Sequence, residues 1–64
     1  MKINGKQIPY EKEITLDILM EQQGFDIKKI AVMKNGEIVP KAEFGRTMIG
    51  AEDSLEVVSF VGGG

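Results

Sequence analysis

The sequence predicts one small α+β domain in which a single helix packs on one face of a mixed sheet. A chain of 64 residues is long enough for only one domain. An Asn-Gly pair occurs twice, each time between short runs that favour strands. Between these two hairpin signals lies one amphipathic segment with helical spacing. Together these observations indicate two hairpins, one helix and a shared sheet.

The first ten residues predict a β-hairpin. Asn4-Gly5 favours a type I′ turn, in which both central residues need positive φ. In the second strand Ile8 and Tyr10 alternate with polar residues. Pro9 has no amide hydrogen to donate, so this strand is expected at an edge of the sheet.

Residues 14–24 predict the helix. Thr15 is a suitable N-cap, and Ile14 with Leu19 fits a hydrophobic staple. Gly24 is placed to end the helix with positive φ. One helix face carries apolar residues: Leu16, Leu19 and Met20. A helix of about eight or nine residues is too short to be stable alone, so it must pack on the sheet.

The second hairpin follows a connector at 25–29. Residues 30–34 read as a strand, Asn35-Gly36 repeats the type I′ signal, and 37–39 form the returning strand. Pro40 ends that strand.

The last part of the chain predicts one helical turn and one strand. We expect a short helical turn at 41–44 that Gly45 stops. Residues 46–50 are compatible with either a short extended piece or a loop. After a turn at 51–54, residues 55–61 form the final strand.

The predicted order is β-β-α-β-β-(short helical turn)-β, with the final strand in the middle of the sheet beside the first. Leu55 and Val57 then point toward the helix. This order matches the ubiquitin-like β-grasp fold. We expect a β-grasp domain over 1–61 and a flexible glycine tail at 62–64.

Composition excludes many kinds of chemistry. The chain has no cysteine and no histidine, which excludes thiolate nucleophiles, imidazole bases and the usual zinc sites. A net charge of −2 disfavours nucleic-acid binding. No apolar run approaches a membrane span and no signal peptide is visible, so we expect a cytoplasmic protein with no membrane contact.

The acidic residues do not form a known metal or catalytic pattern. None matches a calcium-binding loop, and so small a chain has little room for a pocket that perturbs carboxylate pKa values. A solvated acidic face is the expected role, and a patch for a basic partner surface is the alternative. For Asp53 we expect a structural hydrogen bond that caps the turn before the final strand.

The strongest candidate site is the end of the sequence, Gly62-Gly63-Gly64, directly after a predicted strand. Val58 and Phe60 fall on the face opposite Leu55 and Val57, so we expect them to form an exposed docking surface. A glycine tail is thin and accepts any φ, which suits entry into a partner's buried site. The reactive group is then the α-carboxylate of Gly64.

The chain resembles the sulfur carrier proteins of thiamin biosynthesis, the ThiS family, over essentially all its length. The motifs that carry the resemblance are the following: Asn4-Gly5, Thr15-Leu16-x-x-Leu19, Asn35-Gly36-Glu37-Ile38-Val39-Pro40, Asp53-x-Leu55-Glu56-Val57-Val58 and Phe60-Val61-Gly62-Gly63-Gly64. Many family members end in two glycines, whereas this sequence ends in three.

The resemblance implies a carrier that is not itself an enzyme and binds no cofactor. An E1-like, ThiF-like enzyme uses ATP to adenylate the terminal glycine, here Gly64, and Gly62 and Gly63 form the tail that enters partner sites. Sulfur from a cysteine desulfurase then gives a thiocarboxylate, which a ThiG-like thiazole synthase consumes. Val58 and Phe60 are the expected partner contacts.

Three other interpretations stay open from the sequence. The small subunit of molybdopterin synthase is also a β-grasp carrier with a diglycine tail, although its members are usually longer. A ubiquitin-like modifier would join Gly64 to lysine. A plain β-grasp interaction module would use no tail chemistry.

Overall fold

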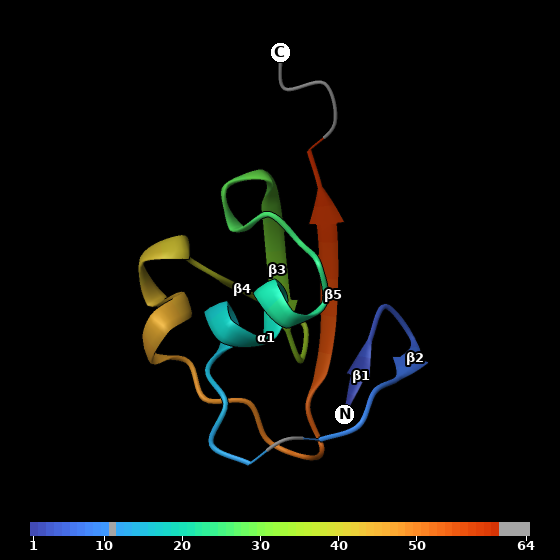
Figure 1. Cartoon of the computed structure of the whole chain (residues 1–64). Helices are drawn as coiled ribbons and strands as arrows, with labels where there is room; N and C mark the ends of the chain where they lie inside the picture. Colours follow the sequence, from blue (N-terminus) through green and yellow to red (C-terminus); the bar gives the residue numbers. More distant parts are fainter. Residues whose placement is uncertain (11, 61–64) are drawn as a thin grey trace.

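A computed structural model describes residues 1–10 and 12–60, which form a two-layer domain with a helix on one face of a five-stranded sheet (Figure 1). The predicted strand at 55–61 runs partly beyond this range, and Gly62, Gly63 and Gly64 lie outside the described residues. The elements in chain order are β1 (Lys2–Ile3), β2 (Lys6–Gln7), α1 (Leu16–Gln22), η1 (Ile27–Lys29), β3 (Ile30–Lys34), β4 (Glu37–Val39), η2 (Lys41–Arg46) and β5 (Ser54–Ser59).

The sheet has the strand order β2-β1-β5-β3-β4, with the last strand in the middle. β5 runs parallel to β1 and antiparallel to β3. The sheet is therefore mixed, and the ubiquitin-like β-grasp arrangement predicted from the sequence is confirmed. Within the described ranges, no helix is long and apolar enough to cross a lipid bilayer.

Both predicted type I′ turns are present. Asn4 and Gly5 have φ of 53° and 80°, and Asn35 and Gly36 have φ of 52° and 86°. β2 is at the edge, as Pro9 indicated, but it is shorter than the predicted strand that continued to Tyr10. The N–H of Ile8 still donates to Met1 at 2.9 Å. Proline follows directly and has no amide hydrogen, so the ladder ends.

The helix has seven residues, slightly fewer than predicted. Thr15 is the N-cap residue, but its hydroxyl bonds the Asp17 carboxylate and does not cap a backbone amide. At the other end Gly24 has φ of 87°, and its N–H donates to Glu21 at 3.1 Å. The N–H of Phe25 reaches Met20 at 3.0 Å, which completes a Schellman motif.

Two features between β4 and β5 differ from or refine the sequence prediction. The turn expected to stop at Gly45 continues as η2 to Arg46, because Gly45 does not adopt the positive φ that ends a helix. The sequence left residues 46–50 open. Arg46 is the last residue of η2, and residues 47–50 form a short extended piece beside the start of the helix. Thr47 accepts from the N–H of Leu16 at 2.9 Å, and Ile49 donates to Ile14 at 3.1 Å.

The core lies between the helix and the inner face of the sheet. Leu55 and Val57 are 0% and 7% exposed, which confirms that they face the helix. The buried apolar residues are Met1, Ile3, Ile14, Leu16, Leu19, Met20, Ile30, Val32, Phe44, Ile49, Leu55 and Val57. Because alternate residues of a strand point to opposite faces, this inner set fixes which side chains of β3, β4 and β5 lie on the outer face.

Candidate functional site

The outer face of the sheet carries an exposed apolar surface, which we call the outer patch. Its members are Met33, Ile38, Val58 and Phe60, which are 37%, 70%, 59% and 52% exposed. Val58 lies opposite Ala31 in the β3–β5 pair, and Met33 lies opposite Ile38 in the β3–β4 pair. Opposite residues of antiparallel strands share a face, so three strands or strand ends supply one surface.

Phe60 is exposed but held in place. Its N–H donates to the carbonyl of Lys29 at 2.7 Å, which continues the β3–β5 register one residue past β5. The Lys41 Nζ lies 5.8 Å from the centre of the Phe60 ring, within the range of a cation–π interaction. The same Nζ donates to the carbonyl of Lys28 at 2.8 Å. The main chain of Phe60 is thus anchored to Lys29, and its ring has a cation–π contact with Lys41.

The structure confirms the predicted exposure of Val58 and Phe60. It also places Met33 and Ile38 on the same outer face, where Met33 lies opposite Glu56 of β5. These two residues were not singled out in the sequence analysis. The available signal was the strand register. Once the second Asn-Gly turn is a two-residue turn, Met33 must pair with Ile38, and both must face away from buried Val32.

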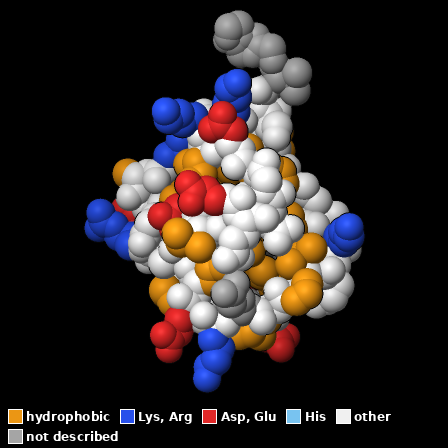
Figure 2. Space-filling view, in the orientation of Figure 1, with side chains coloured by type: hydrophobic (Ala, Val, Ile, Leu, Met, Phe, Trp, Pro, Cys, Tyr) orange, Lys and Arg blue, Asp and Glu red, His pale blue; other side chains and the backbone are white. Residues whose placement is uncertain are grey.

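Three exposed lysines lie where β5 ends, and we call them the lysine end: Lys28, Lys29 and Lys41. Figure 2 shows basic side chains gathered at that end of the molecule. Asp26 is the carboxylate on the same segment, and it accepts a hydrogen bond from the N–H of Lys28 at 3.0 Å. Within residues 1–10 and 12–60, no salt bridge includes any of these lysines.

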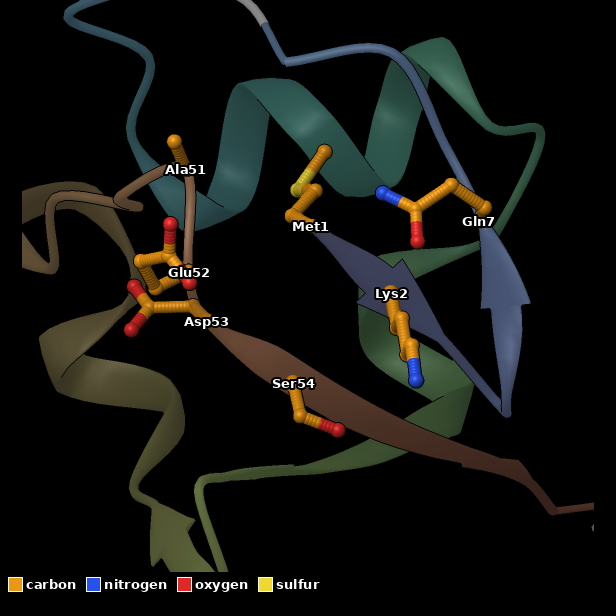
Figure 3. A pocket seen from close by; sticks show the side chains of 7 residues that line it. All are labelled: Met1, Lys2, Gln7, Ala51, Glu52, Asp53 and Ser54. Atoms are coloured by element: carbon orange, nitrogen blue, oxygen red, sulfur yellow. The ribbon is translucent and has the colours of Figure 1, made fainter.

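The opposite end of β5 contains a shallow polar hollow (Figure 3). Its lining residues are Met1, Lys2, Gln7, Ala51, Glu52, Asp53 and Ser54. The Asp53 carboxylate is largely engaged within the protein. One oxygen accepts from the N–H of Gly50 at 2.7 Å, the other accepts from the Asn35 amide at 2.9 Å, and Lys34 Nζ lies 3.8 Å away.

These contacts set the protonation of Asp53. Partial burial opposes ionisation, but the Gly50 N–H, the Asn35 amide and the Lys34 charge outweigh it, so the pKa lies below its ordinary 3.8. The predicted structural role of Asp53 is confirmed, with its hydrogen bond closing the turn back to Gly50. Among the described residues no group of three metal-ligating side chains comes together.

Comparisons with known proteins agree with this geometry. A family model described as the ThiS family matches residues 1–64. The sulfur carrier protein ThiS of Bacillus subtilis is 31% identical over 65 aligned positions, which cover 100% of this chain and 98% of that protein. A thiamine biosynthesis protein (ThiS) from Geobacter metallireducens has a similar structure, with a TM-score of 0.78 at 24% identity, covering 98% of this chain and 96% of that one.

A longer relative contains a matching segment. Thiazole synthase of Paramagnetospirillum magneticum is 39% identical over 62 residues, which cover 97% of this chain. The chain spans only 19% of the length of that relative, so the likeness concerns one segment of it. The family model covers the full sequence, and the carrier from Bacillus subtilis aligns along its whole length. This chain therefore belongs to the ThiS family.

Proposed function

We propose that this protein is a sulfur carrier for the thiazole branch of thiamin biosynthesis. The observation that carries the proposal is the family match over residues 1–64, because it includes both the folded domain and the Gly62-Gly63-Gly64 end of the sequence. In this proposal the protein is a substrate of other enzymes and not an enzyme itself. The carried sulfur is bound at the α-carboxyl carbon of Gly64.

The loading chemistry takes place in two balanced steps. A carboxylate oxygen of Gly64 attacks the α-phosphorus of ATP, which forms an acyl adenylate and releases pyrophosphate. A desulfurase transfers the sulfur of cysteine to a carrier thiol as a persulfide, and a thiol reductant reduces that persulfide to sulfide while a disulfide forms. The sulfide then attacks the acyl carbon and expels AMP. One oxygen leaves with AMP and one sulfur takes its place. No side chain of this protein has to act as acid, base or nucleophile.

The partner enzymes supply everything else in this proposal. An E1-like, ThiF-like enzyme binds and consumes ATP, so the carrier holds no cofactor of its own. The outer patch, with Val58 and Phe60 nearest the tail, is the surface on which that enzyme docks. Large apolar side chains left half exposed on a small domain are typical of such contact surfaces. Gly62 and Gly63 carry Gly64 into the enzyme's site.

Thiazole synthase is the proposed acceptor of the sulfur. The segment of a longer thiazole synthase that is 39% identical to this chain supports a carrier domain that works beside that enzyme. We place the exchange in the cytoplasm, because the proposed chemistry consumes ATP. Sulfur transfer to the thiazole precursor returns the Gly64 carboxylate for another cycle.

Intact-mass spectrometry tests the proposal. The protein is incubated with a ThiF-like enzyme, ATP, a cysteine desulfurase, cysteine and a thiol reductant. The expected product is heavier by about 16 Da, since sulfur replaces one oxygen. A protein with a C-terminal amide at Gly64 is the matched control and is expected to show no gain, because it lacks the carboxylate that reacts with ATP. An unchanged mass of the intact protein under these conditions contradicts the proposal.

The mass measurement and an assay of sulfur transfer to each acceptor together separate the alternatives. A large adduct on another protein indicates a ubiquitin-like modifier. Sulfur transfer to a molybdopterin precursor but not to thiazole synthase indicates the molybdopterin pathway. Either result replaces the proposed function.

A further inference from the structure

The two edges of β5 are paired very differently. Alternate residues of a strand direct their main-chain N–H and C=O groups to opposite edges. Phe60 donates to Lys29, and Ser54 accepts from the N–H of Asn35, so even-numbered residues face β3. Leu55 accepts from the N–H of Asn4 at 2.8 Å, so odd-numbered residues face β1. The β3–β5 register is regular from Ile30–Ser59 to Lys34–Leu55, and it holds this alternation through Ser59.

The β1 side of β5 is covered only along its first part. β1 pairs with Ser54 and Leu55 and then turns away at Asn4. The Asn4 side chain extends the pairing by one step. Its Oδ1 accepts from the N–H of Val57 at 2.8 Å, and its Nδ2 donates to the carbonyl of Val57 at 3.2 Å. The side-chain amide of Asn4 thus makes the two hydrogen bonds to Val57 that the main chain of a neighbouring strand would otherwise make.

Beyond Val57 this edge is open at Ser59. Figure 1 shows β1 and β2 ending beside the lower part of β5, whereas β3 runs along its other side. Within residues 1–10 and 12–60, no strand pairs with Ser59 on the β1 side, and no hydrogen bond to its main chain is found there. A strand edge with an unpaired donor and acceptor is a template for another extended chain.

We propose that the Ser59 edge of β5 is a β-augmentation site for an extended segment of the adenylating enzyme. This inference rests on the proposed function. The segment hydrogen-bonds the N–H and C=O of Ser59, next to the side chains of Val58 and Phe60. In this proposal the enzyme must hold the residues after Phe60 extended toward ATP. Main-chain hydrogen bonds to Ser59 would fix the position of β5 along the enzyme segment and so align those residues with the ATP.

Charge favours an enzyme segment over a second copy of this protein. The lysine end lies at the same end of β5, with the carbonyl of Lys29 bonded to Phe60. In the described part of the chain these lysines have no ion-pair partners. A second copy paired along β5 would bring another three lysines to the contact, which is repulsive. A segment bordered by acidic side chains is complementary to this end.

The test removes one amide hydrogen. In Ser59→Pro the N–H toward the open edge is lost, while the groups that face β3 remain, a position where strands tolerate proline. Ser59→Ala keeps the N–H and is the matched control. Val58→Pro removes an N–H that faces β3 and reports how a broken internal ladder behaves. Adenylation kinetics with a ThiF-like enzyme and thermal unfolding are measured for each variant.

We expect Ser59→Pro to unfold near the wild-type temperature but to lose about tenfold in kcat/KM for adenylation, the order expected for one main-chain hydrogen bond. Ser59→Ala should react like wild type, and Val58→Pro should unfold at lower temperature. As a second measurement on the wild-type protein, hydrogen exchange at the Ser59 amide should be fast in the free protein and slow in the enzyme complex.

Each outcome decides between the proposals. If Ser59→Pro is adenylated as fast as wild type, and hydrogen exchange at the Ser59 amide does not change when the wild-type protein binds the enzyme, this inference is overturned and the proposed function stays intact. Slow Ser59 exchange in a dimer of the free protein overturns it in favour of a second copy. Absence of any wild-type adenylation overturns the proposed function and the inference together. If Ser59→Pro fails to fold, the exchange measurement alone decides.

Discussion

The side-chain amide of Asn4 hydrogen-bonds both main-chain groups of Val57, 53 residues away in the sequence. Asn4 has a second role, since its φ of 53° begins the type I′ turn between β1 and β2. One residue thus closes the first hairpin and ties it to the central strand. A sequence motif that signals a local turn here also supplies a long-range contact.

Asn4→Gly separates these two roles. Glycine accepts the positive φ, so the turn is retained, while both bonds to Val57 are lost. We expect a loss of about 1–3 kcal/mol in the free energy of unfolding, because the Val57 groups lose their partner. Chemical denaturation measures the change, with Lys6→Ala on β2 as an exposed control. Equal stability of Asn4→Gly and wild type would show that the two bonds contribute nothing.

The Asp53 carboxylate makes stability depend on pH. Its pKa in the folded protein lies below its ordinary 3.8, so the unfolded chain takes up the proton first as pH falls. The stabilisation is fully present above pH 3.8 and is lost as pH falls through 3.8 toward the lower folded value. Asp53→Asn should remove this part of the pH dependence in urea unfolding measured from pH 7 down to about pH 2.

The matched control for Asp53 is Glu21→Gln, an exposed carboxylate on the helix. That variant should keep the wild-type decline in stability below pH 3.8. If Asp53→Asn and Glu21→Gln lose stability on acidification as steeply as wild type, the Gly50, Asn35 and Lys34 contacts are not the cause.

The outer patch offers a matched pair of isoleucines. Ile38 is 70% exposed on the outer face, and Ile18 is 44% exposed on the helix in the other layer. If the outer patch is the docking surface, Ile38→Glu should lower kcat/KM for adenylation about tenfold or more, the size of an interface residue that matters. Ile18→Glu should leave it unchanged. Phe60→Glu should behave like Ile38→Glu, and equal effects at Ile18 and Ile38 would exclude a specific patch.

The lysine end should affect the rate of association. Reversing two charges in Lys28→Glu with Lys29→Glu should slow binding to the adenylating enzyme at low salt, and the difference should shrink as salt rises toward about 1 M. Stopped-flow association measures this. Lys6→Glu on β2, away from the end of β5, is the control and should bind like wild type. A salt-independent defect would mean that the lysines act through packing and not through charge.

Much of this fold could be predicted because local signals agree with the tertiary arrangement. The Asn-Gly pairs specify their turns by backbone sterics alone, and buried Leu55 and Val57 fix which face of the last strand is inside. The exact extent of η2 could not be predicted, because Gly45 ends a helix only if it adopts positive φ, and contacts outside the turn decide that.

Part of the candidate site could also be predicted from the sequence. Alternation along one strand was enough to place Val58 and Phe60 outside. Met33 and Ile38 required the pairing of β3 with β4, which is a property of two strands together. The open edge at Ser59 required knowing where β1 ends relative to β5, and no residue of β5 itself signals that.

The central position of β5 also governs how this protein is made. A chain emerges from the ribosome N-terminus first. The two hairpins, however, share no neighbouring strand until β5, with Leu55 and Val57, has been made and lies between them. If synthesis stops before Leu55, Ile3 on β1 and Val32 on β3 lack β5, the strand that pairs with both β1 and β3. Synthesis that stops early thus yields an incomplete core open to proteolysis, so the molecules that survive to meet a partner are those that were translated through β5.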